Sequence, residues 1–320
     1  MNKYTEKAVE VFLETGTKFP RSIIWAMGLL KYAAAKVNTE LGLLDKDIGE
    51  AIMKVSKELA DGLYDDLVIV DVFQTGSGTG LNMNINEIIA TKATQLLGKN
   101  IHPNDHVNIG QSSNDVVPSA IRIAAVYEVE SKLIPSLKRF TDDLRDLVNR
   151  TSDVIKPGRT HLRDALPATM GQEFSAYLDA FEHDLVLLTR AAEYVRELPI
   201  GGTAVGTGLN THPRFGELVV EEINKLTNLG FRVASNRFRA MRTLSNLVNL
   251  SGVLRIMALD LLRLSQDIRL IYSGPNTGFF QFYSRSFYVI AWFSSGPGLQ
   301  PITPTPLGAR GYGFIIASGA

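Results

Sequence analysis

The chain has 320 residues, of which 45% are hydrophobic and 21% are charged, and its formal net charge is +0. This composition is typical of a soluble globular protein with a large core. A neutral balance gives no footprint for nucleic acid or an anionic membrane, and the absence of cysteine excludes disulfides, cysteine-ligated zinc, iron–sulfur clusters held by cysteine and thiol nucleophiles.

The N-terminal part of the chain predicts helices, because apolar residues recur at helical spacing from about Tyr4 to Leu63. No apolar core with a small-residue cleavage site follows Met1, so we expect no signal peptide and a cytoplasmic location. The most apolar late run, 287–293, is too short to cross a bilayer, which needs about 20 residues. We therefore expect neither a membrane nor a nucleic acid as partner.

An apolar run from Leu67 to Phe73 predicts a short strand, which leads into the glycine-rich segment 75–80. That order suggests a dinucleotide-binding loop. The glycines are spaced G-x-G-x-G rather than G-x-G-x-x-G, however, and no βαβ alternation follows, which argues against such a loop. A P-loop at Gly98–Lys99 is excluded as well, because the required Ser/Thr and the earlier glycine are missing.

Small hydrogen-bonding side chains fill the segment from His102 to Asp115, which is too polar for a core element. Segments with helical periodicity lie on both sides of it. We expect Asp115 to cap the second helix and Pro118 to lie in its first turn. Neutral donors at the positive end of a helix dipole suit a small carboxylate or phosphate, and an ordinary capped connection is the alternative.

The rest of the chain alternates between long helices and polar loops. A second polar patch spans 158–165, a helix is expected from about 174 to 195, and a Gly/Thr-rich loop spans 201–210. A last helix, about 238–270, is apolar on nearly all sides, which favours the centre of a bundle or a subunit interface. The predicted fold class is all-α, with an N-terminal helical domain (1–110) and a long-helix bundle (111–278) that is incomplete in this chain.

The composition changes after Asp267, since no Asp, Glu or Lys occurs beyond it while aromatic residues and prolines crowd in without periodicity. We therefore assign residues 279–320 to an aberrant tail.

Three polar loops between long helices resemble the fumarase/aspartase superfamily, and within it the class II fumarate hydratases. The resemblance covers the chain to about Gly278, and the blocks that carry it are QTGSGT (74–79), NMNINE (82–87), HPNDHVN (102–108), QSSND (111–115), GRTHL (158–162) and GGTAVGTGLN (201–210). The Thr160-His161 pair resembles fumarases, since aspartases carry Gln after the Thr. Argininosuccinate and adenylosuccinate lyases share the pair, but blocks 75–79 and 102–105 do not look like theirs. The lack of cysteine agrees with class II, because the other class depends on an iron–sulfur cluster.

The resemblance implies reversible hydration of fumarate to (S)-malate, a small dicarboxylate substrate, no metal and no cofactor. It implies that His161 moves a proton on the water side. The groups implied to bind the substrate carboxylates are Ser77, Gly78, Thr79, Ser112, Ser113, Asn114 and Thr160, and a second dicarboxylate site would use His102, Pro103, Asn104 and Asp105. It also implies a homotetramer in which loops from three subunits share each active site. We expect His106 to be structural and His183 to be solvated.

The match stops where the family continues into a loop of the form Gly-Ser-Ser-x-Met-Pro-x-Lys-x-Asn, the implied source of a catalytic serine base. The nearest echo here is 294–301, where Leu299 stands in the place of the lysine. We therefore hypothesise that the chain is truncated or read out of frame after about Gly278. The alternatives to a fumarase are a catalytically inactive homologue and another lyase of the superfamily such as an aspartase.

Overall fold

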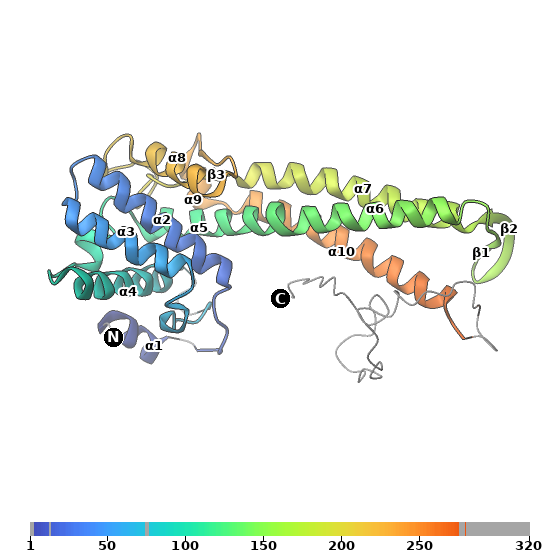
Figure 1. Ribbon diagram of the computed structural model, residues 1–320, viewed down its shortest axis with the longest axis horizontal. Helices are drawn as coiled ribbons and strands as arrows, with labels where there is room; N and C mark the ends of the chain where they lie inside the picture. The colour runs from blue at the N-terminus through green and yellow to red at the C-terminus, as the bar shows by residue number, and fades with distance from the viewer. Residues whose placement is uncertain (1–2, 13, 74–76, 275–278, 280–320) are drawn as a thin grey trace. The chain divides into compact units, whose positions relative to one another are not determined.

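The fold is described from a computed structural model, which describes residues 3–12, 14–73, 77–274 and 279 (Figure 1). These residues form two compact units, unit 1 within 1–132 and 191–250, and unit 2 within 133–190 and 251–320. The described elements are mainly helices, which confirms the all-α fold class. The proposed change of frame and nearly all of the tail 279–320 lie outside the described residues, and the three-part division at 110 and 278 stays a prediction.

Helix α2 is the centre of unit 1, and it contacts α3, α4, α5 and α8. Gly28 of α2 lies so close to α3 that a Cβ at this position would be 2.8 Å from the backbone nitrogen of Ala60, so only glycine allows this approach. The helices expected before Leu63 are confirmed as α1 (Lys3–Val11), α2 (Arg21–Glu40) and α3 (Lys46–Ala60). The unit also contains α4 (Thr79–Leu97), α5 (Ser113–Glu128), α8 (Phe215–Thr227) and α9 (Arg237–Arg242).

The strand predicted at 67–73 is wrong. A short 3₁₀ turn, η1 (Asp65–Leu67), leads into a connection whose backbone donors bond to neighbouring loops and side chains. The N–H of Ile69 donates to Asn84 Oδ1 at 3.0 Å, and that of Val72 donates to the Thr17 carbonyl at 3.0 Å. Val68 and Val70 of this run are buried, whereas Ile69 and Phe73 are exposed, and no neighbouring strand pairs with the run within the described part of the chain.

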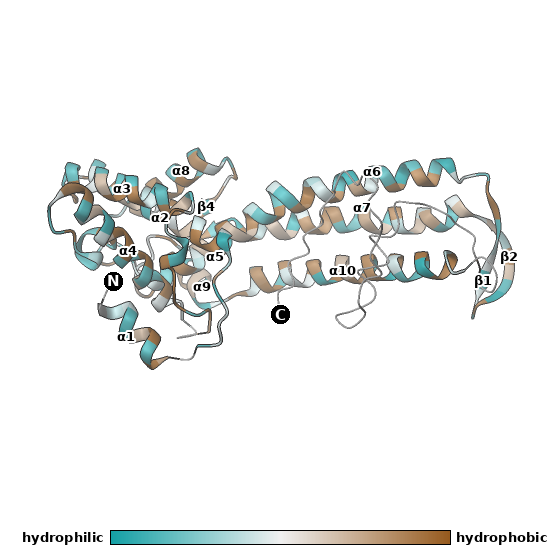
Figure 2. Cartoon of the chain, turned by 60° about the horizontal axis from the view of Figure 1, so that its bottom comes forward, coloured by the Kyte–Doolittle hydropathy of each residue, from teal (hydrophilic) through white to brown (hydrophobic). Residues whose placement is uncertain are grey.

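Unit 2 contains α6 (Ile134–Arg150), most of α7 (Met170–Val195) and most of α10 (Ser245–Ile271), which run lengthwise in Figures 1 and 2. The rings of Phe140 and Phe181 meet edge to face with centroids 5.0 Å apart, which joins α6 to α7. The hydroxyl of Tyr177 donates to Asp267, which joins α7 to α10. A π-helical segment, η3 (Val129–Leu133), connects α5 to α6.

The polar patch at 158–165 forms part of a β-hairpin in unit 2, made of β1 (Ile155–Thr160) and β2 (Arg163–Thr169) paired antiparallel. A second small pair, β3 (Glu197–Leu198) and β4 (Arg232–Val233), is parallel and lies in unit 1. These short strands are the departures from a purely helical fold among the described residues.

The last predicted helix is interrupted. Helix α9 ends at Arg242, Thr243 has extended backbone angles, and α10 begins at Ser245. The Thr243 side chain and N–H both donate to the Arg239 carbonyl, which satisfies the end of α9 and lets the chain leave the helix. Hydrophobic residues recur along α10 (Figure 2), and among them Ile256, Leu259 and Leu262 are exposed.

Candidate active site

Two helix N-termini meet in unit 1. Gly78 precedes α4 with φ 73°, and a Cβ there would lie 2.5 Å from Cγ1 of Val117 in α5. Asn82 of α4 donates from Nδ2 to the Ser113 hydroxyl at 3.1 Å. The structure therefore brings the predicted segments 77–79 and 112–114 together, with two positive helix ends beside each other.

Ser112 caps α5, and the prediction that Asp115 does so is wrong. Ser112 Oγ accepts a hydrogen bond from the N–H of Asn114 at 3.2 Å, and Asp115 Oδ1 accepts one from the N–H of Ser112 at 2.9 Å. This is a capping box, in which the acidic residue is the third of the helix. The helix therefore starts earlier than expected, and Pro118 lies inside α5 beyond its first turn.

The Gly/Thr-rich loop is tied to α5 by the same carboxylate. Asp115 Oδ2 accepts hydrogen bonds from the N–H groups of Gly201 at 3.1 Å and Thr203 at 2.9 Å, and Asn114 Nδ2 donates to the Ala204 carbonyl at 2.8 Å. Asp115 is fully buried, and this burial raises its pKa to about 6, while its hydrogen bonds and Lys31 act in the opposite direction. One carboxylate thus fixes two of the polar loops.

A buried lysine lies beneath the polar loops. Lys31 of α2 is fully buried, and its Nζ donates to Asn108 Oδ1 and to Gln111 Oε1, both at 2.9 Å. Burial lowers the pKa of Lys31 to about 7, although the charge of Asp115 opposes that shift. The site therefore contains an ionisable pair of opposite sign, with no exposure to solvent.

Lys31 was not among the residues predicted from the sequence. A signal was available, because Lys31 is the one charged residue between Ser22 and Ala35, in a helix that is otherwise apolar on most sides. Such a lysine either extends to solvent or is held by partners. Asn82, Asn108 and Gln111 lie inside the recognised blocks, but their contacts with one another required the structure.

The predicted second dicarboxylate site forms one turn, η2 (Pro103–Val107), in unit 1. His102 precedes it, and its Nδ1 accepts hydrogen bonds from the N–H groups of Asn104 at 3.3 Å and Asp105 at 3.2 Å. His106 Nδ1 accepts a hydrogen bond from the N–H of His102 at 2.8 Å, a contact in keeping with the structural role expected of it. A binding role for 102–105 stays a prediction.

Thr160 and His161 lie in unit 2, where the hairpin pairs Thr160 with Arg163 across a turn of two residues, His161 and Leu162. Both turn residues have left-handed angles, with φ 49° and 62°, which glycine adopts far more readily. Thr160, His161 and Leu162 are all exposed. The exposed tip presents Thr160 and His161 to solvent, with His161 in a strained backbone conformation.

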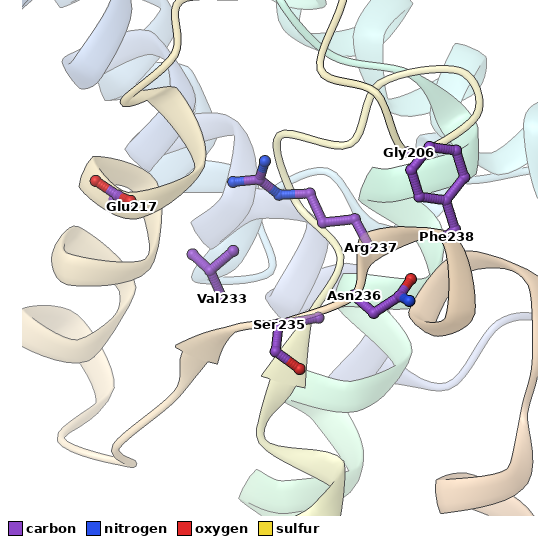
Figure 3. Close-up of a pocket in the computed structure, with 8 residues that line it drawn as sticks. Gly206, Glu217, Val233, Ser235, Asn236, Arg237 and Phe238 are labelled. Carbon is purple, nitrogen blue, oxygen red and sulfur yellow. The ribbon is translucent and has the colours of Figure 1, made fainter.

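A separate cavity of about 530 Å³ lies in unit 1 near the Gly/Thr-rich loop (Figure 3). Arg237 and Glu217 line it with charges of opposite sign, and the ring of Phe238 packs against Gly206, where a Cβ would be 2.9 Å from the ring. The other lining residues are Val233, Ala234, Ser235 and Asn236. None of the predicted site residues lines this cavity, so we assign it no role.

Comparison with known proteins gives consistent results. A family model described as "Lyase" matches residues 1–286. The chain is 58% identical over 302 residues to the class II fumarate hydratase of Saccharolobus solfataricus, covering 94% of this chain and 69% of that protein. It is 44% identical over 280 residues to the class II fumarate hydratase of Nitrosomonas europaea, covering 86% of this chain and 61% of that protein.

Among solved structures, the recombinant class II fumarase from Schistosoma mansoni superposes with a TM-score of 0.83 at 35% identity, covering 86% of this chain and 62% of that one. The chain therefore spans about two thirds of the length of these proteins. Within the described ranges, no helix is both long and apolar enough to cross a membrane. Because the family model matches most of the chain, this protein belongs to the lyase family, in which the relatives named here are class II fumarate hydratases.

Proposed function

We propose that the protein is a hydro-lyase that reversibly hydrates fumarate to (S)-malate. The observation that carries the proposal is the meeting of the two donor segments, 77–79 and 112–114, at the N-termini of α4 and α5. Neutral hydroxyl and N–H donors beside two positive helix ends suit a ligand with carboxylate groups. The 58% identity to a class II fumarate hydratase supports the same reaction.

The chemistry needs groups that stabilise charge and a group that moves a proton. Addition of water across the double bond puts extra negative charge on one carboxylate while a proton is transferred to the neighbouring carbon. Fixed donors stabilise that charge without reorganising. We assign carboxylate binding to Ser77, Gly78, Thr79, Ser112, Ser113, Asn114 and Thr160. His161 takes a proton from water or returns it, since imidazole both accepts and donates.

We further propose that the active protein is a cytoplasmic homotetramer in the tricarboxylic acid cycle, with each active site shared between subunits. Thr160 and His161 belong to the hairpin of unit 2, and the serine and threonine donors belong to unit 1. The exposure of His161 at the hairpin tip leaves it available to another copy. Exposed apolar side chains on α10, such as Ile256 and Leu259, support burial against further subunits.

The test is the loss of fumarate ultraviolet absorbance with the purified protein. Turnover that decreases by about 10²- to 10⁴-fold in His161→Ala, the usual range for removing a general acid–base group, would support the proposal. His183→Ala is the matched control, because His183 is an exposed histidine on α7. Binding of fumarate without turnover would favour an inactive homologue, and turnover of aspartate without malate would favour an aspartase.

A further inference from the structure

A chain of hydrogen bonds leads from the buried lysine to a predicted substrate-binding hydroxyl. Asn108 Oδ1 accepts from Lys31 Nζ at 2.9 Å and from Asn82 Nδ2 at 3.2 Å. Asn82 Nδ2 also donates to Ser113 Oγ at 3.1 Å. Four side chains from α2, α4, the polar loop and α5 are therefore connected in one series.

Lys31 fixes the direction of this series, because its Nζ donates to both Asn108 and Gln111, and a lysine amine keeps two N–H donors even when it is not protonated. Asn108 must present its oxygen to Lys31, and the same oxygen then receives one N–H of Asn82. The second N–H of Asn82 goes to Ser113 Oγ. Ser113 is an acceptor on its inner side, so its own hydrogen remains for a ligand. No acceptor for that hydroxyl is found among the residues that the structure describes.

The amide of Asn108 is held on its other side as well. Asn108 Nδ2 donates to the Gln111 carbonyl at 3.2 Å, and Gln111 Oε1 accepts from Lys31. Gln111 Nε2 donates to the Val107 carbonyl at 3.0 Å. In both amide groups the oxygen accepts from Lys31 and the nitrogen donates to a backbone carbonyl, so turning either amide over would break hydrogen bonds on both of its sides.

One atom shows that this orientation has a cost. Asn82 Oδ1 is buried and has no hydrogen-bond partner within the described part of the chain. A reversed Asn82 amide would direct this oxygen at Ser113 and accept the serine proton, and Ser113 would then present only lone pairs to a carboxylate. The observed orientation leaves a buried acceptor unsatisfied and keeps the serine proton available.

We propose that Lys31 is a positioning residue that makes Ser113 a hydrogen-bond donor to the substrate carboxylate, acting through Asn108 and Asn82. The inference rests on the proposed function, since Ser113 is assigned to carboxylate binding there. Lys31 is fully buried, so bulk water does not compete for the hydrogen bonds of its Nζ. Asp115 is the charged group whose field acts on it, and that carboxylate is held by backbone N–H groups of three residues.

A double-mutant cycle tests the proposal, with Lys31→Met, Ser113→Ala and the double variant. The probe is succinate, a four-carbon dicarboxylate that cannot be hydrated, and the readout is its dissociation constant by calorimetry. We expect each single substitution to raise the dissociation constant of succinate by about 10- to 100-fold, the usual effect of losing a hydrogen bond to a charged group. The double variant should bind succinate as tightly as the single variant with the larger loss, because both substitutions remove the same interaction. Multiplied losses would overturn the proposal.

Kinetics separate positioning from unfolding. We expect KM for fumarate to rise in Lys31→Met with little change in kcat, whereas partial unfolding lowers the apparent kcat and leaves KM unchanged. Lys54→Met is the matched control, because Lys54 is exposed on α3; it should leave succinate binding unchanged.

A measurement without ligand tests the network independently of the proposed function. Side-chain NH₂ protons of Asn82 should exchange with water at least about 10-fold faster in Lys31→Met than in the unsubstituted protein, because the fixed orientation is lost. Equal exchange would overturn the inference. Absence of succinate binding and of turnover in the unsubstituted protein would instead refute the proposed function, and the exchange comparison would still decide the role of Lys31.

Discussion

The carboxylate of Asp115 accepts a hydrogen bond from the backbone N–H of Thr203 at 2.9 Å, across 88 residues of chain. The same carboxylate accepts from Gly201 and from Ser112, so one buried side chain holds the first turn of α5 against the Gly/Thr-rich loop. Because Asp115 is fully buried, the geometry of the candidate site depends on a group that does not face solvent.

The raised pKa of Asp115 predicts a stability that depends on pH. Folded Asp115 has a pKa of about 6, against 3.8 in the unfolded chain, so the folded state binds more protons between these values. Its contribution is fully present below pH 3.8 and is lost as pH rises to about 6. The free energy of unfolding, relative to Asp115→Asn, should fall by up to about 1.4 kcal/mol per pH unit in this window.

Urea titrations of both proteins at intervals from pH 4 to 6 measure this difference. Asp66→Asn serves as control for the removal of a carboxylate, because Asp66 is exposed. A flat difference for Asp115→Asn would show that the buried carboxylate does not titrate there.

The lowered pKa of Lys31 predicts the opposite slope at higher pH. Folded Lys31 has a pKa of about 7, against 10.5 in the unfolded chain, so the unfolded state binds more protons between these values. The cost of burying its charge is complete below pH 7 and decreases as pH rises. Relative to Lys31→Met, the unfolding free energy should rise by up to about 1.4 kcal/mol per pH unit from pH 7 to 10, as measured in urea. A decrease would contradict the burial argument.

Gly78→Ala should separate α4 from α5. The new Cβ would lie 2.5 Å from Val117 Cγ1, and φ is 73°, so overpacking adds to the cost of a left-handed alanine, for a loss of about 2 to 4 kcal/mol of unfolding free energy. Gly98→Ala is the control, since φ is also 73° but nothing lies within 4 Å; it should cost about 1 kcal/mol. Adding Val117→Ala to Gly78→Ala should recover part of the loss. Equal effects at the two glycines would exclude the steric contact.

Leu162→Gly should stabilise the hairpin that carries His161. Leu162 is exposed and has φ 62°, so glycine relieves backbone strain without loss of packing, and we expect a gain of about 0.5 to 1 kcal/mol in unfolding free energy. Leu166→Gly is the matched control, because Leu166 is exposed in the extended strand β2, and it should be destabilising. Thermal unfolding of both variants measures these changes in stability. A lower stability of Leu162→Gly would show that contacts of the Leu162 side chain stabilise the hairpin by more than the backbone strain destabilises it.

The sequence predicted most helices because their apolar residues keep a 3.6-residue period, as in α2 and α7. It failed where the deciding partner is distant in the chain. The run 67–73 has the composition of a strand, but its donors bond to Thr17 and Asn84. Thr243 interrupts the last helix through a side-chain bond to Arg239, an interaction that hydrophobic periodicity does not detect.

The site was predicted unevenly for similar reasons. Motif blocks located the segments 77–79 and 112–114, which the structure brings together. Asp115 was predicted to be the N-cap of α5. It is instead the third residue of that helix, because Ser112 is the N-cap. Lys31 was missed because depth of burial is a tertiary property, and helical spacing alone does not distinguish a buried lysine from a solvated one.

The link from Asp115 to Gly201 and Thr203 also orders events during synthesis. A nascent chain that ends near Arg190 already contains Lys31 and Ser113, but it has none of the loop donors that the carboxylate receives in the folded protein. Until that loop leaves the ribosome, water molecules must donate hydrogen bonds to the Asp115 carboxylate instead of the loop N–H groups. The start of α5 then has only its local cap. This end of unit 1 is therefore completed only after residues 201–203 have been made, when α1 to α5 have already emerged.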